Sequence, residues 1–173
     1  MVRVLEAASV GRYKIYAALS YLILAKERKE LNYASEAARD LASIGIDEES
    51  IKDFLSRSVK TPLARECLVS RVGVEWYLRA LTDFYAHNGY EPSGVQPDHP
   101  AIMLAFTAHL IKKEIEEPKE RMTCWRLQHR FIKTYLIGAL KCLALRAPCR
   151  FTEATLNVIR VDLNLLFETL TCK

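Results

Sequence analysis

Hydrophobic residues recur at helical spacing along most of the chain, and polar or turn-forming residues separate the periodic segments. The pattern predicts about seven helices, over residues 10–29, 33–43, 48–59, 61–88, 101–117, 119–146 and 153–170. No strand pattern, repeat or linker interrupts them. We therefore predict one all-α domain over residues 1–173, a bundle of mostly antiparallel helices.

Residues that commonly cap helices precede five of the predicted helices: Asn32, Asp47, Thr61, Asp98 and Thr152. Their side-chain oxygens can accept hydrogen bonds from the free N–H groups of a first helical turn. The helix over 10–29 is apolar almost all round, which predicts a central position in the bundle. The polar run over 112–117 is typical of a solvated helix end.

Composition excludes several classes of protein. Hydrophobic residues make up 50% of the chain and charged residues 27%, an ordinary globular balance. The net charge of +4 is too small to indicate a nucleic-acid or membrane surface. The most apolar run, over 15–25, is shorter than the roughly 20 residues that a membrane span needs.

The chain has five cysteines: Cys67, Cys124, Cys142, Cys149 and Cys172. No two form a CxxC pair and the number is odd, which argues against zinc and against a secreted disulfide scaffold. We expect buried thiols in a reducing cytoplasm, unless the source is a hyperthermophile. Whether Cys142 and Cys149 pair is left open.

The stretch Gln96-Pro97-Asp98-His99-Pro100 carries the most distinctive chemistry. Asp98 and Pro100 suit a helix start, but a helix start alone does not require His99, a titratable ring beside a carboxylate. The aromatic residues Trp76, Tyr77, Phe84 and Tyr85 lie upstream in the helix that leads to this loop. They are either core residues or one wall of a binding groove.

Three classes of protein stay open on these residues. No GxxxxGK[ST] or GxSxG motif occurs, so nothing demands catalysis. A metal-dependent hydrolase could use Asp98 and His99, although further ligands are missing. A helical regulatory or adaptor domain could use the short helices around Gly45. The second of these helices, however, opens with acidic residues, which would repel the phosphates of DNA. The third class is a protein that binds a partner in a groove walled by these aromatic residues.

The motif residues resemble those of the redox-enzyme maturation chaperones of the TorD, DmsD and NarJ kind. Pro97-Asp98-His99 resembles the loop signature of that family. The helices that follow resemble its structural motif through Leu104, Phe106, Gln128 and Phe131. The chain departs from the family pattern at Pro100, Met103, Thr107, Tyr135 and Ala139.

The resemblance implies a cytoplasmic, non-enzymatic assembly chaperone. Such proteins bind the N-terminal segment, often a twin-arginine signal peptide, of a molybdenum- or tungsten-containing oxidoreductase subunit until its cofactor is in place. It implies no metal, nucleic-acid or membrane partner, weak guanine-nucleotide binding at most, and a monomer or a domain-swapped dimer.

We therefore predict a peptide-binding site formed by Pro97, Asp98, His99, Trp76, Phe84 and Tyr85. In this hypothesis Asp98 pairs with an arginine of the client, and the aromatic rings contact its apolar segment. His99 orients Asp98 or binds the peptide backbone.

Overall fold

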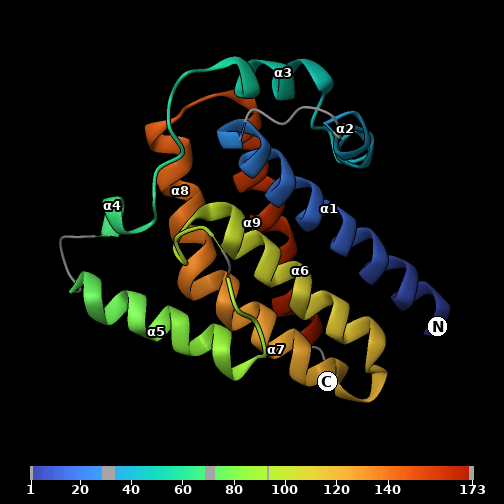
Figure 1. The fold of residues 1–173 in the computed structure, drawn as a ribbon. Coiled ribbons are helices and arrows are strands. Elements are labelled where there is room, and N and C mark those ends of the chain that lie inside the picture. Colours follow the sequence, from blue (N-terminus) through green and yellow to red (C-terminus); the bar gives the residue numbers. More distant parts are fainter. Residues whose placement is uncertain (1, 29–33, 69–72, 93, 172–173) are drawn as a thin grey trace.

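The computed structural model describes residues 2–28, 34–68, 73–92 and 94–171. These residues contain helices and no strand, which confirms the all-α fold. The α-helices are α1 (Val2–Arg28), α2 (Ala34–Ala42), α3 (Glu48–Ser56), α4 (Arg65–Leu68), α5 (Val74–His87), α6 (Pro100–Glu116), α7 (Arg121–Phe131), α8 (Ile137–Arg146) and α9 (Arg150–Thr171) (Figure 1). A 3-10 turn, η1 (Pro118–Glu120), precedes α7, and a π-helical turn, η2 (Ile132–Leu136), joins α7 to α8.

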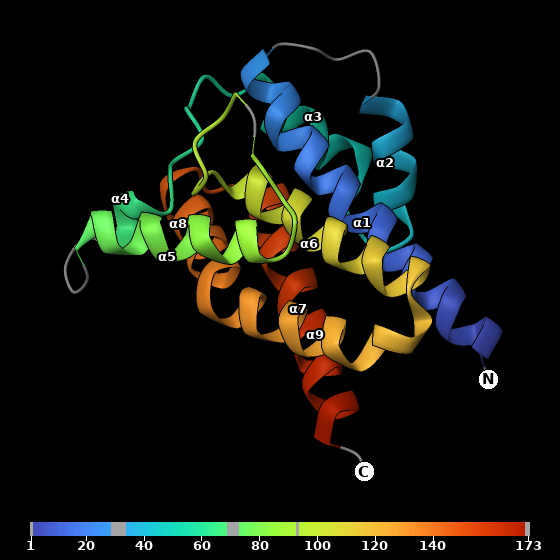
Figure 2. The same ribbon diagram turned by 60° about the horizontal axis from the view of Figure 1, so that its bottom comes forward.

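Helix α6 is the most enclosed helix, because nearly every one of its side chains up to Ile111 is buried. Helix α1 packs along it, and α7 contacts another of its sides (Figure 2). The prediction that the first helix would be central was therefore only partly right. That helix buries Tyr16, Leu19 and Leu22 but leaves Lys14 exposed.

The long helix predicted over 61–88 is wrong. Thr61 and Pro62 lie in an irregular segment, and the chain forms the short α4 before α5 begins after Gly73. The irregular segment is held by a tertiary contact, since the Ala64 N–H donates to the carbonyl of Asp98 at 3.0 Å. That contact fixes a backbone conformation which the helical periodicity did not anticipate.

Helix α1 begins at Val2, so the predicted start at residue 10 is also wrong, although its predicted end is close to Arg28. The remaining helix boundaries follow the sequence more closely. Asp47 caps α3 as predicted, accepting from the Ser50 N–H at 2.6 Å. Helix α9 begins at Arg150, earlier than predicted, although Thr152 still accepts from the Cys149 N–H at 3.1 Å. Asn32, the predicted cap of α2, lies outside the described residues.

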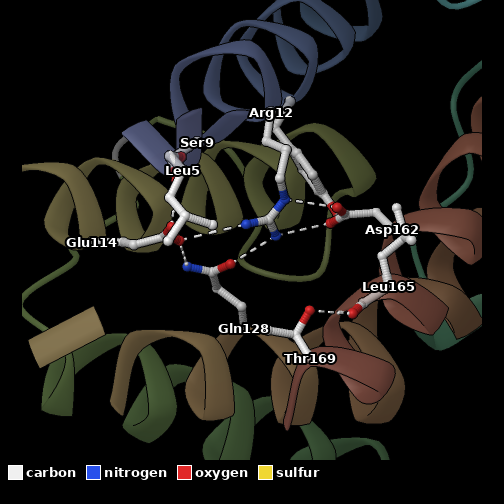
Figure 3. A network of polar contacts seen from close by, with 9 residues as sticks. Leu5, Ser9, Arg12, Glu114, Gln128, Asp162, Leu165 and Thr169 are labelled. Carbon is white, nitrogen blue, oxygen red and sulfur yellow. Dashed lines mark hydrogen bonds and ion pairs between the residues drawn. The ribbon is translucent and has the colours of Figure 1, made fainter. Parts of the chain in front are cut away.

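A buried polar network ties α1, α6, α7 and α9 together (Figure 3). Arg12 donates to both carboxylate oxygens of Asp162, at 2.7 and 2.9 Å, and to Gln128 Oε1 at 2.7 Å. Gln128 in turn donates to Glu114 at 2.9 Å, and Ser9 donates to the same carboxylate. Burial would lower the pKa of Arg12, but Asp162 and then Glu114 raise it above its ordinary value.

Glu114 corrects the prediction of a solvated helix end over 112–117. Its side chain is fully buried, whereas the flanking Lys112 and Glu116 are exposed and 3.6 Å apart. The run is therefore amphipathic, with one acidic residue turned into the bundle.

The cysteines also differ from the prediction of reduced, buried thiols. Cys67 and Cys142 form a disulfide, with Cα atoms 5.6 Å apart, that joins α4 to α8. Cys124 and Cys149 are buried free thiols, so Cys142 and Cys149 do not pair. Cys172 lies outside the described residues.

Candidate functional site

The loop between α5 and α6 carries the sequence motif and is fixed at both ends. Gly89 leaves α5 with a φ of +72°, a left-handed conformation that glycine adopts without strain. Near the other end of the loop, Tyr85 donates its hydroxyl to the carbonyl of Pro97 at 2.8 Å. Burial, followed by the neighbouring Tyr77, raises the pKa of Tyr85 well above its ordinary value, so the hydroxyl stays a donor.

Asp98 is completely buried and does not cap α6. Its carboxylate accepts three hydrogen bonds from Arg65: from the backbone N–H at 3.0 Å, from Nε at 2.8 Å and from a terminal guanidinium nitrogen at 2.5 Å. The same arginine donates to Gln96 Oε1 at 2.9 Å. The cap predicted at Asp98 is therefore wrong, and this carboxylate already holds an arginine from its own chain.

His99 is the residue that caps α6. Its Nδ1 accepts from the Ala101 N–H at 3.2 Å, and Pro100 occupies the first helical position. A neutral ring that accepts at Nδ1 carries its proton on Nε2, which lies 3.0 Å from Glu27 Oε1. The side chain of His99 is buried, whereas that of Glu27 is 30% exposed. The sequence-predicted His99 thus orients a carboxylate that the sequence analysis missed.

The predicted aromatic wall is divided between core and surface. Tyr85 is fully buried, and Phe84 is half-buried against Phe106, Phe131 and Tyr135. Trp76 is 66% exposed near the start of α5. Tyr85 therefore holds the motif loop through its buried hydroxyl and does not line a groove.

The structural motif residues, Leu104, Phe106, Gln128 and Phe131, are all fully buried. Phe106 and Phe131 pack ring to ring with centroids 4.6 Å apart. Gln128 is the amide that bridges Arg12 and Glu114 in the buried network. These residues hold α6 and α7 together below the loop.

A cleft of about 490 Å³ opens beside His99. Its lining comes from α1, the segment before α4 and the motif loop, and consists of Glu27, Lys60, Thr61, Leu63, Gly94, Val95, Gln96 and His99. The cleft combines an exposed carboxylate with apolar surface from Leu63 and Val95. Such a surface can accept a cationic side chain at one point and aliphatic groups next to it.

The described part of the chain shows no group of three or more His, Cys, Asp or Glu side chains placed to hold a metal ion. Asp98 faces Arg65 and His99 faces Glu27, so the pair does not converge on one point. Among the described residues, no helix has the length and apolar character needed to cross a bilayer.

The model of one family, described as the nitrate reductase delta subunit, matches residues 75–137 of this chain. The match runs from α5 through the motif loop, α6 and α7, and it confirms the resemblance to the redox-enzyme maturation chaperones. That family consists of molybdoenzyme assembly chaperones and not of catalysts.

The Arg65–Asp98 pair gives a first testable prediction. Replacing Arg65 with methionine leaves the buried carboxylate with one backbone donor. We expect the free energy of unfolding to fall by about 2 kcal/mol, because hydrogen bonds to charged groups are worth about 1.5–3 kcal/mol and Arg65 is partly solvent-screened. Urea denaturation measures the loss, with Arg79→Met, an exposed change on α5, as the control. Equal losses in the two variants would mean that Asp98 does not depend on Arg65.

Proposed function

We propose that this protein is a cytoplasmic assembly chaperone that binds the N-terminal signal segment of a molybdenum- or tungsten-containing oxidoreductase subunit. It holds that segment, typically one with a twin-arginine motif, until the cofactor is inserted. The family match supports the chaperone class. The cleft beside His99 supports the choice of ligand, because it places an accessible carboxylate next to apolar surface.

Glu27 is the residue that carries this proposal. A signal segment has basic residues followed by an apolar stretch, so its receptor needs an accessible acid beside an apolar surface. Asp98 is sealed by Arg65, whereas Glu27 reaches solvent and is held by His99. An arginine of the client binds Glu27, and the apolar stretch contacts Leu63 and Val95.

The other predicted site residues have supporting roles in this proposal. Asp98 fixes the motif loop through Arg65, and Pro97 is held by Tyr85. Trp76 is the one exposed ring among Trp76, Phe84 and Tyr85, but it does not line this cleft. We expect its replacement to affect binding less than a change at Glu27.

A peptide-binding measurement tests the proposal. The probe is a fluorescent synthetic peptide with two arginines followed by a short apolar segment, and its affinity is measured by anisotropy. We expect Glu27→Gln to weaken binding about tenfold or more, because a charge-assisted hydrogen bond is worth about 1.5–3 kcal/mol.

The matched control is Glu36→Gln, which changes an exposed glutamate on α2 and has no expected effect. A peptide with glutamines in place of the arginines gives a second control, and it should bind the parent protein as weakly as the arginine peptide binds Glu27→Gln. If Glu27→Gln and Glu36→Gln both bind the arginine peptide like the parent, the cleft is not the peptide site.

A further inference from the structure

A second and larger cleft shares Glu27, Lys60 and Thr61 with the cleft beside His99. It has a volume of about 720 Å³ and is bounded by the last turn of α1 and by the segment that follows α3. Ala25, Leu55 and Val59 give it an apolar lining. Its polar and charged lining residues are Lys26, Glu27, Ser56, Arg57, Ser58, Lys60 and Thr61. Nothing in the proposed chaperone function uses the Lys26 side of this cleft.

Lys26 is the first unusual group in this cleft. Its ammonium is shielded from solvent and has no hydrogen-bond partner within the described part of the chain. It lies 4.2 Å from the centre of the Phe54 ring, a cation–π contact that compensates only part of the lost hydration. Burial lowers the pKa of Lys26, which reflects the same missing hydration.

Thr61 is the second unusual group in this cleft. Its side chain is only 2% exposed, and its hydroxyl lacks a hydrogen-bond partner among the residues that the structure describes. A buried hydroxyl without a partner is costly, and most such groups in proteins are satisfied by a neighbour, water or a ligand. Two unsatisfied donors therefore line the same cleft.

The described charged residues near the cleft make no hydrogen bond to the Lys26 ammonium or the Thr61 hydroxyl. Arg57 is occupied by Asp53 and by the carbonyl of Pro148. Glu27 lines both clefts, and its carboxylate contacts His99 at 3.0 Å. Lys60 is exposed at the border of both clefts and makes no ion pair with another described residue. The described lining of this cleft therefore carries the cations Lys26, Arg57 and Lys60 against the one carboxylate of Glu27, so its local charge is positive.

We propose that this cleft binds an oxyanion carried on an aliphatic group, most simply a carboxylate, with Lys26 and Thr61 as its donors. The carboxylate accepts from the Lys26 ammonium and the Thr61 hydroxyl, and Lys60 adds positive charge at the entrance. The aliphatic part contacts Leu55 and Val59. The site goes beyond peptide binding and does not require the chaperone function to be correct.

Titration of the full-length protein with hexanoate tests this site. Backbone amide signals are followed by NMR, and we expect saturable shifts at residues 26 and 61 and their neighbours. Lys26→Met, which keeps the aliphatic stem, should weaken hexanoate binding about tenfold or more, and Thr61→Val should weaken it by a smaller factor. Lys52→Met is the control, since Lys52 is exposed and pairs with Glu48.

Three comparisons decide the outcome. Hexanamide should bind more weakly than hexanoate, and equal binding of the two would overturn the role of the charge. Inorganic phosphate should also bind more weakly, and equal or tighter phosphate binding would overturn the role of the aliphatic group. Unchanged hexanoate affinity in both Lys26→Met and Thr61→Val would overturn the site itself, whatever the peptide measurements show.

Discussion

Replacing Arg12 with methionine is expected to lower the free energy of unfolding by about 3–5 kcal/mol, the usual loss when one partner of a buried ion pair is removed. Arg12 is the only cation in a network with two carboxylates, Glu114 and Asp162, among the residues shown in Figure 3. Methionine fills much of the same volume but leaves both carboxylates without a counter-charge. Urea denaturation with circular dichroism measures the change.

The control for Arg12→Met is Arg160→Met, which alters an exposed arginine on the same helix as Asp162. Its expected effect is below about 0.5 kcal/mol, as for surface changes in general. A double-mutant cycle with Asp162→Asn should give a coupling energy of about 0.5–3 kcal/mol. Additive losses would show that Arg12 and Asp162 do not stabilise each other, despite their 2.7 Å contact.

Local signals in the sequence predicted the local structure well. Asp47 precedes a short amphipathic segment and caps α3, and the apolar run after Pro100 forms α6. In both cases the residues that decide the conformation lie within a few positions of one another. Helix periodicity and capping residues report directly on such short-range interactions, so they predict these elements.

Hydrogen bonds and ion pairs between residues far apart in the sequence could not be predicted in this way. Asp98 has the side chain of a helix cap, but an arginine 33 residues earlier binds it and His99 caps α6 instead. Glu114 lies in a charged run, yet Arg12 and Gln128, both distant in the sequence, allow it to be buried. The charge of a side chain predicts that it needs a partner or solvent, and only the fold shows which of the two it has.

The same distinction separates the family motif from the proposed site. The matched region, residues 75–137, includes the motif loop and the helices that support it. Glu27, Lys60 and Thr61 lie before that region, although they line the cleft with His99. The motif therefore indicates where the loop is built, while α1 and the segment before α4 supply the rest of the cleft lining.

Reduction of the Cys67–Cys142 disulfide is expected to lower the free energy of unfolding by about 4.5 kcal/mol, on the chain-entropy estimate for a separation of 75 residues. The disulfide reduces the number of conformations open to the unfolded chain, and in the folded protein it holds α4 against α8. Urea denaturation with and without dithiothreitol measures the effect. Alkylation of the oxidised, unfolded protein followed by mass spectrometry should leave Cys67 and Cys142 unmodified.

Two variants make this measurement specific. The double variant Cys67→Ser/Cys142→Ser should unfold at the same urea concentration with and without the reductant. Cys149→Ser, which changes a buried free thiol, should keep the full response to reduction. An oxidised parent protein with no response would contradict a stabilising disulfide.

The disulfide also affects how much the Arg65–Asp98 contact in the motif loop contributes to the stability of the protein. Cys67 lies two residues after Arg65, so the bond to α8 holds the backbone that delivers the guanidinium to Asp98. Without the bond, part of the energy of the Arg65–Asp98 contact is needed to order α4. Arg65→Met should therefore cost less stability in the double serine variant than in the oxidised parent, and equal costs would show that the disulfide and the loop are independent.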